Sequence, residues 1–263
     1  MVLHDQHVHS SFSGDSKANL NEYYQIAKNL GCSYFVTTEH LDYDITMLKC
    51  DWIVDVKALK AELNQIEVQD GPKTLLGIEV GYRSDYLEQI KQILNSENFD
   101  LINLSIHDSG QIEYYFVDGF KQIGIKETMQ IYYQQMLEAV SNFDSFDVLS
   151  HLDYGFKTAY KIDPTYDFLS DGEVIKQILT ILIKKGKALE INTKVQKDLP
   201  SSHLSTLLSL YQSLGGTRLT LSSDAHQIGR YLDGFEKYKA IIKQAGFKFL
   251  CYFVARKEYH FDI

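Results

Sequence analysis

Short apolar runs rich in β-branched residues alternate with longer amphipathic segments along the chain. The apolar runs are typical of buried strands, and the amphipathic segments have the period of helices packed on one face. The expected strands are residues 2–8, 34–38, 74–80, 101–106, 146–150, 187–192 and 218–223. The expected helices are residues 18–30, 53–67, 85–95, 126–142, 172–185, 201–214 and 231–245. Seven successive strand-then-helix units predict an α/β fold with parallel strands and helical crossovers.

One domain is expected over residues 1–263. The chain has no Gly/Ser linker, no low-complexity segment and no block of like charge. Its C-terminal stretch, residues 247–263, is rich in aromatic and β-branched residues. That composition predicts a short edge strand or a packed extension, and we assign it no function.

Histidines and carboxylates recur at the ends of the expected strands. Because a closed barrel of parallel strands gathers all its carboxyl ends at one face, such side chains would meet there. An open sheet would instead concentrate its site at one switch point, so this distribution favours a closed barrel. The residues at these positions are His7, His9, His40, Glu79, His107, His151, Asp224 and His226.

Two pairs have a spacing of two residues, His7 with His9 and Asp224 with His226. A period of two places both members of a pair on the same face of a strand. The pairs fall on the first and last strands, which become neighbours if the barrel closes. Asp15 follows the first pair in a loop and joins the candidates, although it could also be a turn residue or a helix N-cap.

These nine side chains are too many for one tetrahedral ion and suit two or three cations; one metal with spare polar groups is the simpler alternative. Imidazole and carboxylate ligands without thiolate favour Zn, Mn or Fe. A cluster of this kind activates water and binds phosphate oxygens, so phosphoester hydrolysis is the expected reaction class.

The remaining histidines, His4, His203 and His260, are interpreted as structural or surface residues. His4 has the opposite strand parity from His7 and His9, so it should face the helical layer. Asp5 shares the parity of His7. It could orient a ligand imidazole or be an ordinary buried, hydrogen-bonded carboxylate.

Composition limits the partners and the compartment. The hydrophobic content of 44%, with 23% charged residues, is ordinary for a globular protein, and the net charge of −9 argues against non-specific nucleic-acid binding. No apolar run is long enough for a transmembrane helix, and the start does not resemble a signal peptide. Three scattered cysteines predict free thiols. We therefore expect a cytoplasmic protein. The expected reaction, phosphoester hydrolysis, makes a small phosphorylated substrate the expected partner.

The motifs at these strand ends resemble those of the polymerase-and-histidinol-phosphatase (PHP) family. The segments that carry the resemblance are, in family order, HVHSSFSGDS, TTEH, GIEVGY, SIHD, SHLDY, LEINTK and SSDAH. HLDY and LEINTK are most similar to the bacterial histidinol-phosphate phosphatase branch. The resemblance implies a distorted (β/α)7 barrel with a trinuclear metal centre, acting in histidine biosynthesis.

Carried over by position, the resemblance assigns the nine side chains to three cations. One would be held by His7, His9, Glu79 and Asp224, and Glu79 would bridge to a second that also binds His107 and His151. The third would bind Asp15, His40 and His226. Asp224 or His226 would pass a proton to the leaving alkoxide.

The chain departs from this branch at its phosphate-binding positions. Where relatives carry two arginines, Lys157 and Lys194 stand here. A lysine is a point charge without the bidentate fork of arginine. We expect Lys157, Lys194 and Arg230 to bind phosphate, with Arg83 a further candidate.

The leading hypothesis is a metal-dependent phosphomonoesterase that hydrolyses L-histidinol phosphate. Asp42, Asp44 and Asp108 are candidates for binding the substrate amine. The alternatives are a phosphatase for another small ester, a phosphodiesterase or exonuclease, and, least favoured, a non-catalytic metal-binding module.

Overall fold

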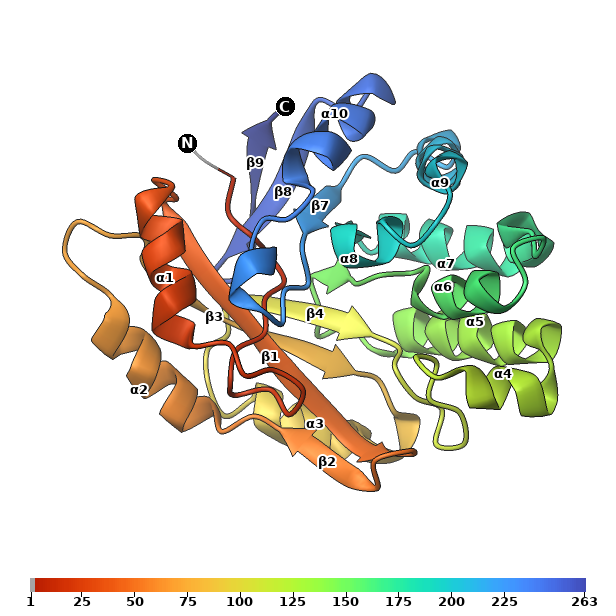
Figure 1. Ribbon diagram of the computed structural model, residues 1–263, viewed down its shortest axis with the longest axis horizontal. Coiled ribbons are helices and arrows are strands. Elements are labelled where there is room, and N and C mark those ends of the chain that lie inside the picture. The colour runs from red at the N-terminus through yellow and green to blue at the C-terminus, as the bar shows by residue number, and fades with distance from the viewer. Residues whose placement is uncertain (1–2) are drawn as a thin grey trace.

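The computed structural model describes residues 3–263 and centres on a seven-stranded sheet (Figure 1). The strand order is β2-β1-β3-β4-β5-β6-β7, and every neighbouring pair is parallel except β1 with β2. The predicted α/β class with a mostly parallel sheet is confirmed. The strands are β1 (Tyr34–Ile45), β2 (Cys50–Ile53), β3 (Lys73–Gly81), β4 (Leu101–Ser105), β5 (Val148–Leu149), β6 (Ala188–Asn192) and β7 (Leu219–Ser222).

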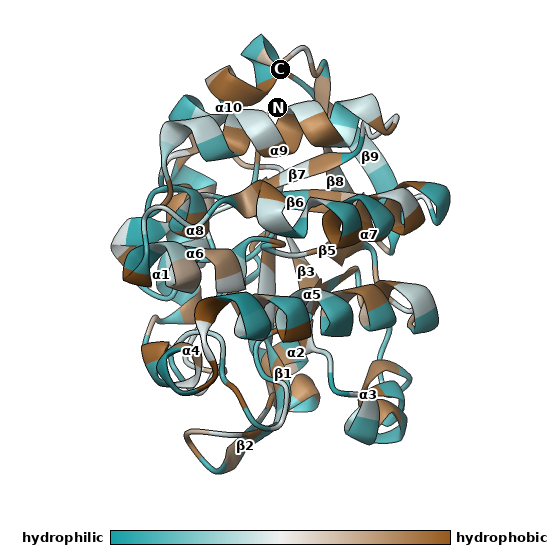
Figure 2. Cartoon of the chain, turned by 90° about the vertical axis from the view of Figure 1, so that its right-hand side faces the viewer, coloured by the Kyte–Doolittle hydropathy of each residue, from teal (hydrophilic) through white to brown (hydrophobic). Residues whose placement is uncertain are grey.

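Helices connect and cover these strands. Figure 1 shows α1 and α2 beside β1 on one side of the molecule and α4 to α7 stacked on the other. Figure 2 shows apolar and polar stripes alternating along α5 and α7, as expected for helices with one buried face. The helices are α1 (Leu20–Asn29), α2 (Val56–Ile66), α3 (Leu87–Leu94), α4 (Val117–Ile123), α5 (Ile125–Asn142), α6 (Tyr154–Ile162), α7 (Gly172–Lys184), α8 (Thr193–Gln196), α9 (Ser201–Ser213) and α10 (Phe235–Gln244).

The seven predicted helices all form, with small shifts at their ends. Local capping explains two of the starts: Asn19 accepts a hydrogen bond from the amide of Glu22, and Asp55 accepts one from Ala58. The sequence analysis missed β2 because it began a helix at residue 53. Asp55 delays that helix, and β1 continues past residue 38 into a hairpin with β2.

The first predicted strand, residues 2–8, is wrong over the described part, because residues 3–8 form no regular strand; residue 2 lies outside the described residues. Val8 accepts a hydrogen bond from the Thr38 amide at 2.8 Å, and His9 donates one to Ala225 at 2.8 Å. The segment therefore contacts both β1 and the residues after β7, but through single bonds. The Asp5 carboxylate competes for backbone amides here, which interrupts a ladder. Barrel closure stays a prediction.

The C-terminal stretch is a packed hairpin of β8 (Phe249–Val254) and β9 (Lys257–Asp262). Its strand β8 buries Cys251 and Phe253 against residues near the amino ends of five sheet strands, which closes the end of the sheet opposite the predicted site. Those five residues are Val36, Leu75, Leu101, Val148 and Ala188.

Two further expectations concern the whole chain. Cys32, Cys50 and Cys251 are free thiols, as predicted. Within residues 3–263, no helix is both long and apolar enough to cross a membrane.

Candidate metal centre

Glu79 lies at the centre of a histidine cluster. It stands in β3 beside His40 of β1, because the parallel register pairs these two residues, and it is 1% exposed. Each of its carboxylate oxygens lies close to imidazole nitrogens from several different segments. Oε1 is 3.2 Å from His7 Nε2, 3.3 Å from His107 Nε2 and 2.9 Å from His151 Nε2, while Oε2 is 3.3 Å from His9 Nε2 and 3.0 Å from His40 Nδ1.

Asp224, Asp15 and His226 extend this cluster on one side. Asp224 Oδ1 is 3.5 Å from His9 Nε2 and 3.3 Å from His226 Nδ1. The Asp15 carboxylate lies 2.9 Å from His226 Nε2 and 3.5 Å from His40 Nε2. The structure therefore brings all nine candidate side chains into one continuous group.

Two of these residues have unusual backbone conformations. His151 follows β5 with a φ of 22°, and Asp224 follows β7 with a φ of 50°. Positive φ at a non-glycine residue costs about 1–3 kcal/mol and persists where the surrounding structure enforces it. Here the turn points both side chains into the cluster, which indicates a functional site.

Three histidines are oriented by partners that leave Nε2 facing Glu79. Nδ1 of His7 is 2.7 Å from Glu190 Oε1, Nδ1 of His9 is 3.0 Å from Ser13 Oγ, and Nδ1 of His107 is 2.9 Å from Asp42 Oδ1. Metal-binding histidines usually hold their second nitrogen in this way. The hydrogen bonds therefore preset these rings for metal ligation.

The sequence analysis did not identify Glu190, Ser13 and Asp42 as these partners. Strand parity could have found Asp42, which lies two residues after His40 on the same strand face. Asp5, the orienting carboxylate considered from sequence, instead accepts hydrogen bonds from Ser223, Leu232 and the His7 amide. It is a buried structural carboxylate, and Glu190 orients the imidazole of His7.

Several buried side-chain nitrogen and oxygen atoms in the cluster lack a hydrogen-bond partner among residues 3–263. They are Nε2 of His7 and His9, both ring nitrogens of His40, Nδ1 of His151 and Oε2 of Glu79. An unsatisfied buried polar group costs about 1–3 kcal/mol, so such a concentration indicates a ligand. Four three-residue sets here have donor atoms within 4.8 Å of one another, one of them including Asp42. Imidazole and carboxylate donors of this kind fit Zn, Mn or Fe.

Carboxylates and imidazoles of the cluster shift one another's pKa values. Burial would raise the pKa of Glu79, but His7, His107 and His40 outweigh it and hold that pKa well below its usual range. Burial likewise opposes protonation of His107, yet Asp42 and Glu79 raise its pKa to about 10. A metal ion must displace such protons, so metal binding should weaken as pH falls.

The cluster lines a cavity of about 560 Å³, a size that suits a small molecule. Seven of the nine clustered side chains line it, namely Asp15, His40, Glu79, His107, His151, Asp224 and His226. The rest of the lining includes both apolar and charged side chains, namely Tyr43, Ile45, Leu48, Trp52, Arg83, Asp108, Glu113, Tyr115, Phe116 and Tyr154.

The predicted phosphate-binding residues differ in position. Lys194 lines the cavity, with Nζ 3.2 Å from Asp224 Oδ1 and 3.1 Å from His226 Nδ1. Lys157 is not among the lining residues, but its Nζ is 4.9 Å from the ring centre of Tyr154, which is. Arg230 pairs with Asp233 at 2.6 Å and is not among the lining residues.

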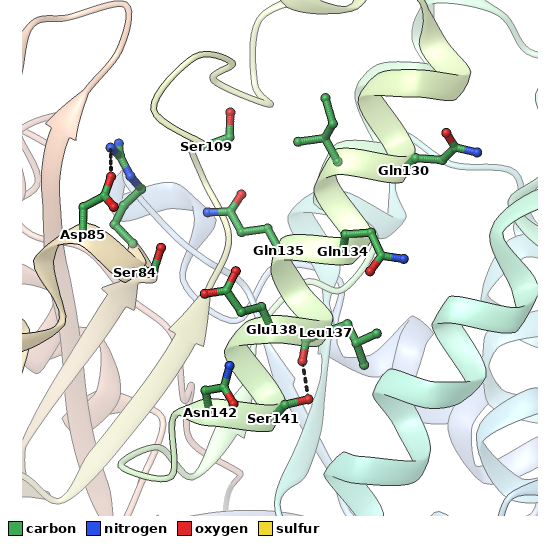
Figure 3. Close-up of a pocket in the computed structure, with 12 residues that line it drawn as sticks. Ser84, Asp85, Ser109, Gln130, Gln134, Gln135, Leu137, Glu138, Ser141 and Asn142 are labelled. Carbon is green, nitrogen blue, oxygen red and sulfur yellow. Dashed lines mark hydrogen bonds and ion pairs between the residues drawn. The ribbon is translucent and has the colours of Figure 1, made fainter.

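A second cavity of about 710 Å³ lies beside α5 and shares Arg83 with the first (Figure 3). Figure 3 shows Gln134, Gln135 and Glu138 of α5 on one side and Ser84 on the other. Gln135 donates hydrogen bonds to the Tyr82 and Asp108 carbonyls, which ties it to the fold. None of the nine clustered residues lines this cavity.

A mostly parallel α/β sheet with a buried histidine and carboxylate cluster at its carboxyl end defines the chain as a candidate metalloprotein. Comparison with known proteins narrows this class, because a model of the PHP domain matches residues 5–194. The chain belongs to the PHP family, which confirms the resemblance found in its motifs.

Its relatives include histidinol-phosphatase from Lactococcus lactis subsp. lactis, 33% identical over 257 residues, which are 96% of this chain and 95% of the relative. A probable histidinol-phosphatase from Thermotoga maritima is 28% identical over 94% of both chains. Among solved structures, histidinol phosphate phosphatase from Lactococcus lactis, complexed with zinc, L-histidinol and phosphate, aligns with a TM-score of 0.84 at 30% identity. That alignment covers 96% of this chain and 97% of the other.

Proposed function

We propose that this protein is a metal-dependent phosphomonoester hydrolase that converts L-histidinol phosphate and water to L-histidinol and phosphate. One observation carries the proposal: Glu79 and eight other histidine and carboxylate side chains form one group, and seven of the nine line a cavity sized for a small molecule. Support comes from the Lactococcus lactis structure, which resembles this chain over 96% of its length and contains zinc, L-histidinol and phosphate.

The proposed cofactors are two to three divalent ions, of Zn, Mn or Fe. One would be held by His7, His9, Glu79 and Asp224, and Glu79 would be shared with a second that also binds His107 and His151. A third would take Asp15, His40 and His226. Such cations lower the pKa of water and neutralise phosphate oxygens.

The lysines would hold the substrate phosphate. Lys194 reaches the cavity beside Asp224 and His226, and Lys157 is held by the rings of Tyr115 and Tyr154 at 5.4 and 4.9 Å. An aromatic contact restrains an ammonium group without neutralising its charge, so Lys157 stays available to an anion. Arg230 would act only if its pairing with Asp233 were broken.

Asp224 or His226 would supply the proton that the leaving alkoxide needs. Asp224 Oδ1 and His226 Nδ1 are 3.3 Å apart, and the Lys194 ammonium lies within 3.2 Å of both. Lys194 lowers the pKa of Asp224 despite the opposing effect of burial. Asp224 is therefore ionised at neutral pH and carries no proton to give, so the proposal assigns the donor role to His226.

The non-phosphate half of the substrate would contact the part of the cavity lined by Trp52 and Glu113. Of the acids considered from sequence, Asp42 is bonded to His107 and Asp108 to Arg83. Among residues 3–263, the Glu113 side chain accepts only a long hydrogen bond, 3.3 Å, from the Met47 amide. Its carboxylate is thus the freest in the cavity, and we assign it to a cationic group of the substrate.

The wider proposal is that residues 1–263 act as one cytoplasmic domain in histidine biosynthesis, with no nucleic-acid partner. A cavity this small also argues against the phosphodiesterase or exonuclease alternative, because a polynucleotide needs an extended groove. The non-catalytic alternative leaves the strained turns at His151 and Asp224 without a purpose.

A substrate panel tests the proposal. Purified, metal-replete enzyme is assayed with L-histidinol phosphate, other small phosphomonoesters and bis-p-nitrophenyl phosphate. We expect the highest kcat/KM with L-histidinol phosphate, and a selective loss of that preference in Glu113→Gln. Faster hydrolysis of the diester than of every monoester would contradict the proposal.

A further inference from the structure

A buried polar cluster outside the cavity joins three helices. His203 of α9 lies with Nε2 2.8 Å from Asp153 Oδ2, and the Gln196 side-chain amide of α8 donates to the same oxygen. Asp153 stands immediately before α6. All three side chains are at most 5% exposed, and none of them lines the cavity.

The Asp153 side chain does not cap α6, although it stands at the N-cap position. It occupies the N-cap of α6, where an aspartate normally accepts a hydrogen bond from the first turn of the helix. Its side chain makes no such bond here and turns instead toward His203 and Gln196. The carboxylate therefore gives up a capping bond to connect α6 with α8 and α9.

The connected helices carry the two lysines that we propose bind phosphate. Lys157 lies in the first turn of α6 and donates its backbone amide to the Asp153 carbonyl at 2.9 Å. Lys194 stands on α8, two residues before Gln196. The link from Gln196 to Asp153 is thus a direct connection between the two short elements that present these ammonium groups.

A connection between the two helices matters more when the phosphate ligands are lysines than when they are arginines. An arginine fork carries its own geometry to a phosphate, whereas a lysine is a point charge on a flexible stem. For a pair of lysines, the spacing between the charges depends on where their helices sit. His203 adds rigidity, because its ring stacks on Phe156 of α6 at 5.0 Å and meets Phe168 edge-on at 4.6 Å.

We propose that His203 is a positioning residue: by holding Asp153 together with Gln196, it fixes α6 relative to α8 and so sets the separation of Lys157 and Lys194 for phosphate. This inference rests on the proposed phosphate-binding function of the two lysines. It gives a role to a histidine whose sequence context suggested only structure or surface.

The test is the affinity of the metal-replete protein for inorganic phosphate, measured by calorimetry. His203→Phe keeps the ring packing but removes the hydrogen bond to Asp153. We expect the phosphate Kd, and the KM for any monoester the enzyme hydrolyses, to rise about three- to thirtyfold. The kcat should stay within about twofold, and metal content should not change. His203→Gln, which can donate to Asp153, should restore most of the affinity.

Two controls separate positioning from a general loss of stability. His260→Phe makes the same change at an exposed histidine of β9 and should leave the phosphate Kd unaltered. In a Lys157→Ala/Lys194→Ala background, His203→Phe should have little further effect, because the groups it positions are gone. An equal effect in that background, or an unchanged Kd in the wild-type background, would overturn the inference.

If His203→Phe fails to fold, Gln196→Leu breaks the same connection from α8 and is judged by the same Kd values. The measurement uses inorganic phosphate binding and needs no particular ester. Failure of the enzyme to hydrolyse L-histidinol phosphate would therefore count against the proposed function. The role of His203 would still be decided by the phosphate Kd values.

Discussion

The imidazole of His7 is held by Glu190, with Nδ1 2.7 Å from Oε1, while its Nε2 faces Glu79 at 3.2 Å. Glu190 is 2% exposed and also accepts hydrogen bonds from Ser222 and the His151 amide. One carboxylate behind the site therefore fixes the ring of one metal-ligand candidate and the backbone of another.

Replacing Glu190 should weaken metal binding without removing a ligand. In Glu190→Gln the amide can no longer supply two acceptor oxygens, so the orientation of His7 and the turn at His151 both loosen. We expect metal affinity to fall about 10–100-fold, measured by chelator competition. Glu173→Gln, at an exposed acid of α7, is the matched control. Unchanged affinity would show that His7 needs no such support.

Glu79 should matter more than His40. Its two oxygens face five histidines, so Glu79→Ala should disturb two cation sites at once, whereas His40→Ala should mainly weaken one. With added metal, we expect Glu79→Ala to lose at least about 100-fold in kcat/KM and His40→Ala less. Near-wild-type turnover in Glu79→Ala, with an intact thermal transition, would rule out a bridging carboxylate.

Lys194 should contribute to phosphate binding rather than to metal binding. Lys194→Ala removes a charge-assisted hydrogen bond, so kcat/KM should fall by an amount equivalent to about 1.5–3 kcal/mol. Lys194→Arg should retain activity or improve it, and metal content should be unaltered in both variants. If Lys157→Ala and Lys194→Ala both keep wild-type kcat/KM, phosphate is held elsewhere, and Arg83 and Arg230 become the residues to test.

His4 should make the fold sensitive to acid. Both ring nitrogens are buried without a hydrogen-bond partner among residues 3–263, between the rings of Tyr34 and Tyr252. Burial lowers the pKa of His4 to about 3 from an ordinary value of 6.5. The unfolded chain therefore binds this proton more readily, so stability falls as pH drops below about 6.5 and continues to fall to about pH 3.

At pH 5 this one histidine should cost about 2 kcal/mol of unfolding free energy. His4→Phe should remove that component, so the variant should lose less stability than the wild type between pH 7 and pH 5. Urea unfolding of both proteins at one metal concentration measures the difference. Equal losses would mean that His4 is protonated in the folded state.

The sequence predicted the ligand candidates better than their surroundings. Imidazole and carboxylate at the ends of parallel strands, as at His107 and Asp224, must converge in this fold class, so their meeting followed from topology. Glu190 and Asp42 were not identified as imidazole partners because each lies within a strand that looks ordinary. Their importance depends on which imidazole nitrogen lies beside them. Such pairing is a tertiary property that strand periodicity does not encode.

Irregular segments were the least predictable part of the fold. Residues 3–8 were expected to continue a strand, but the Asp5 side chain takes backbone amides that a ladder would use. The hairpin of β1 and β2 extends a strand that the pattern ended at residue 38. His203 looked unremarkable in a helix, because only the folded chain brings Asp153 to its ring.

Metal content tests the central claim most directly. The account requires that the nine clustered side chains bind several cations and that these cations are needed for hydrolysis. Elemental analysis of gently purified protein should find two to three Zn, Mn or Fe ions per chain. Chelation should abolish hydrolysis of L-histidinol phosphate, and added Zn or Mn should restore it. One ion or none per chain, with no gain in activity on adding Zn or Mn, would contradict the account.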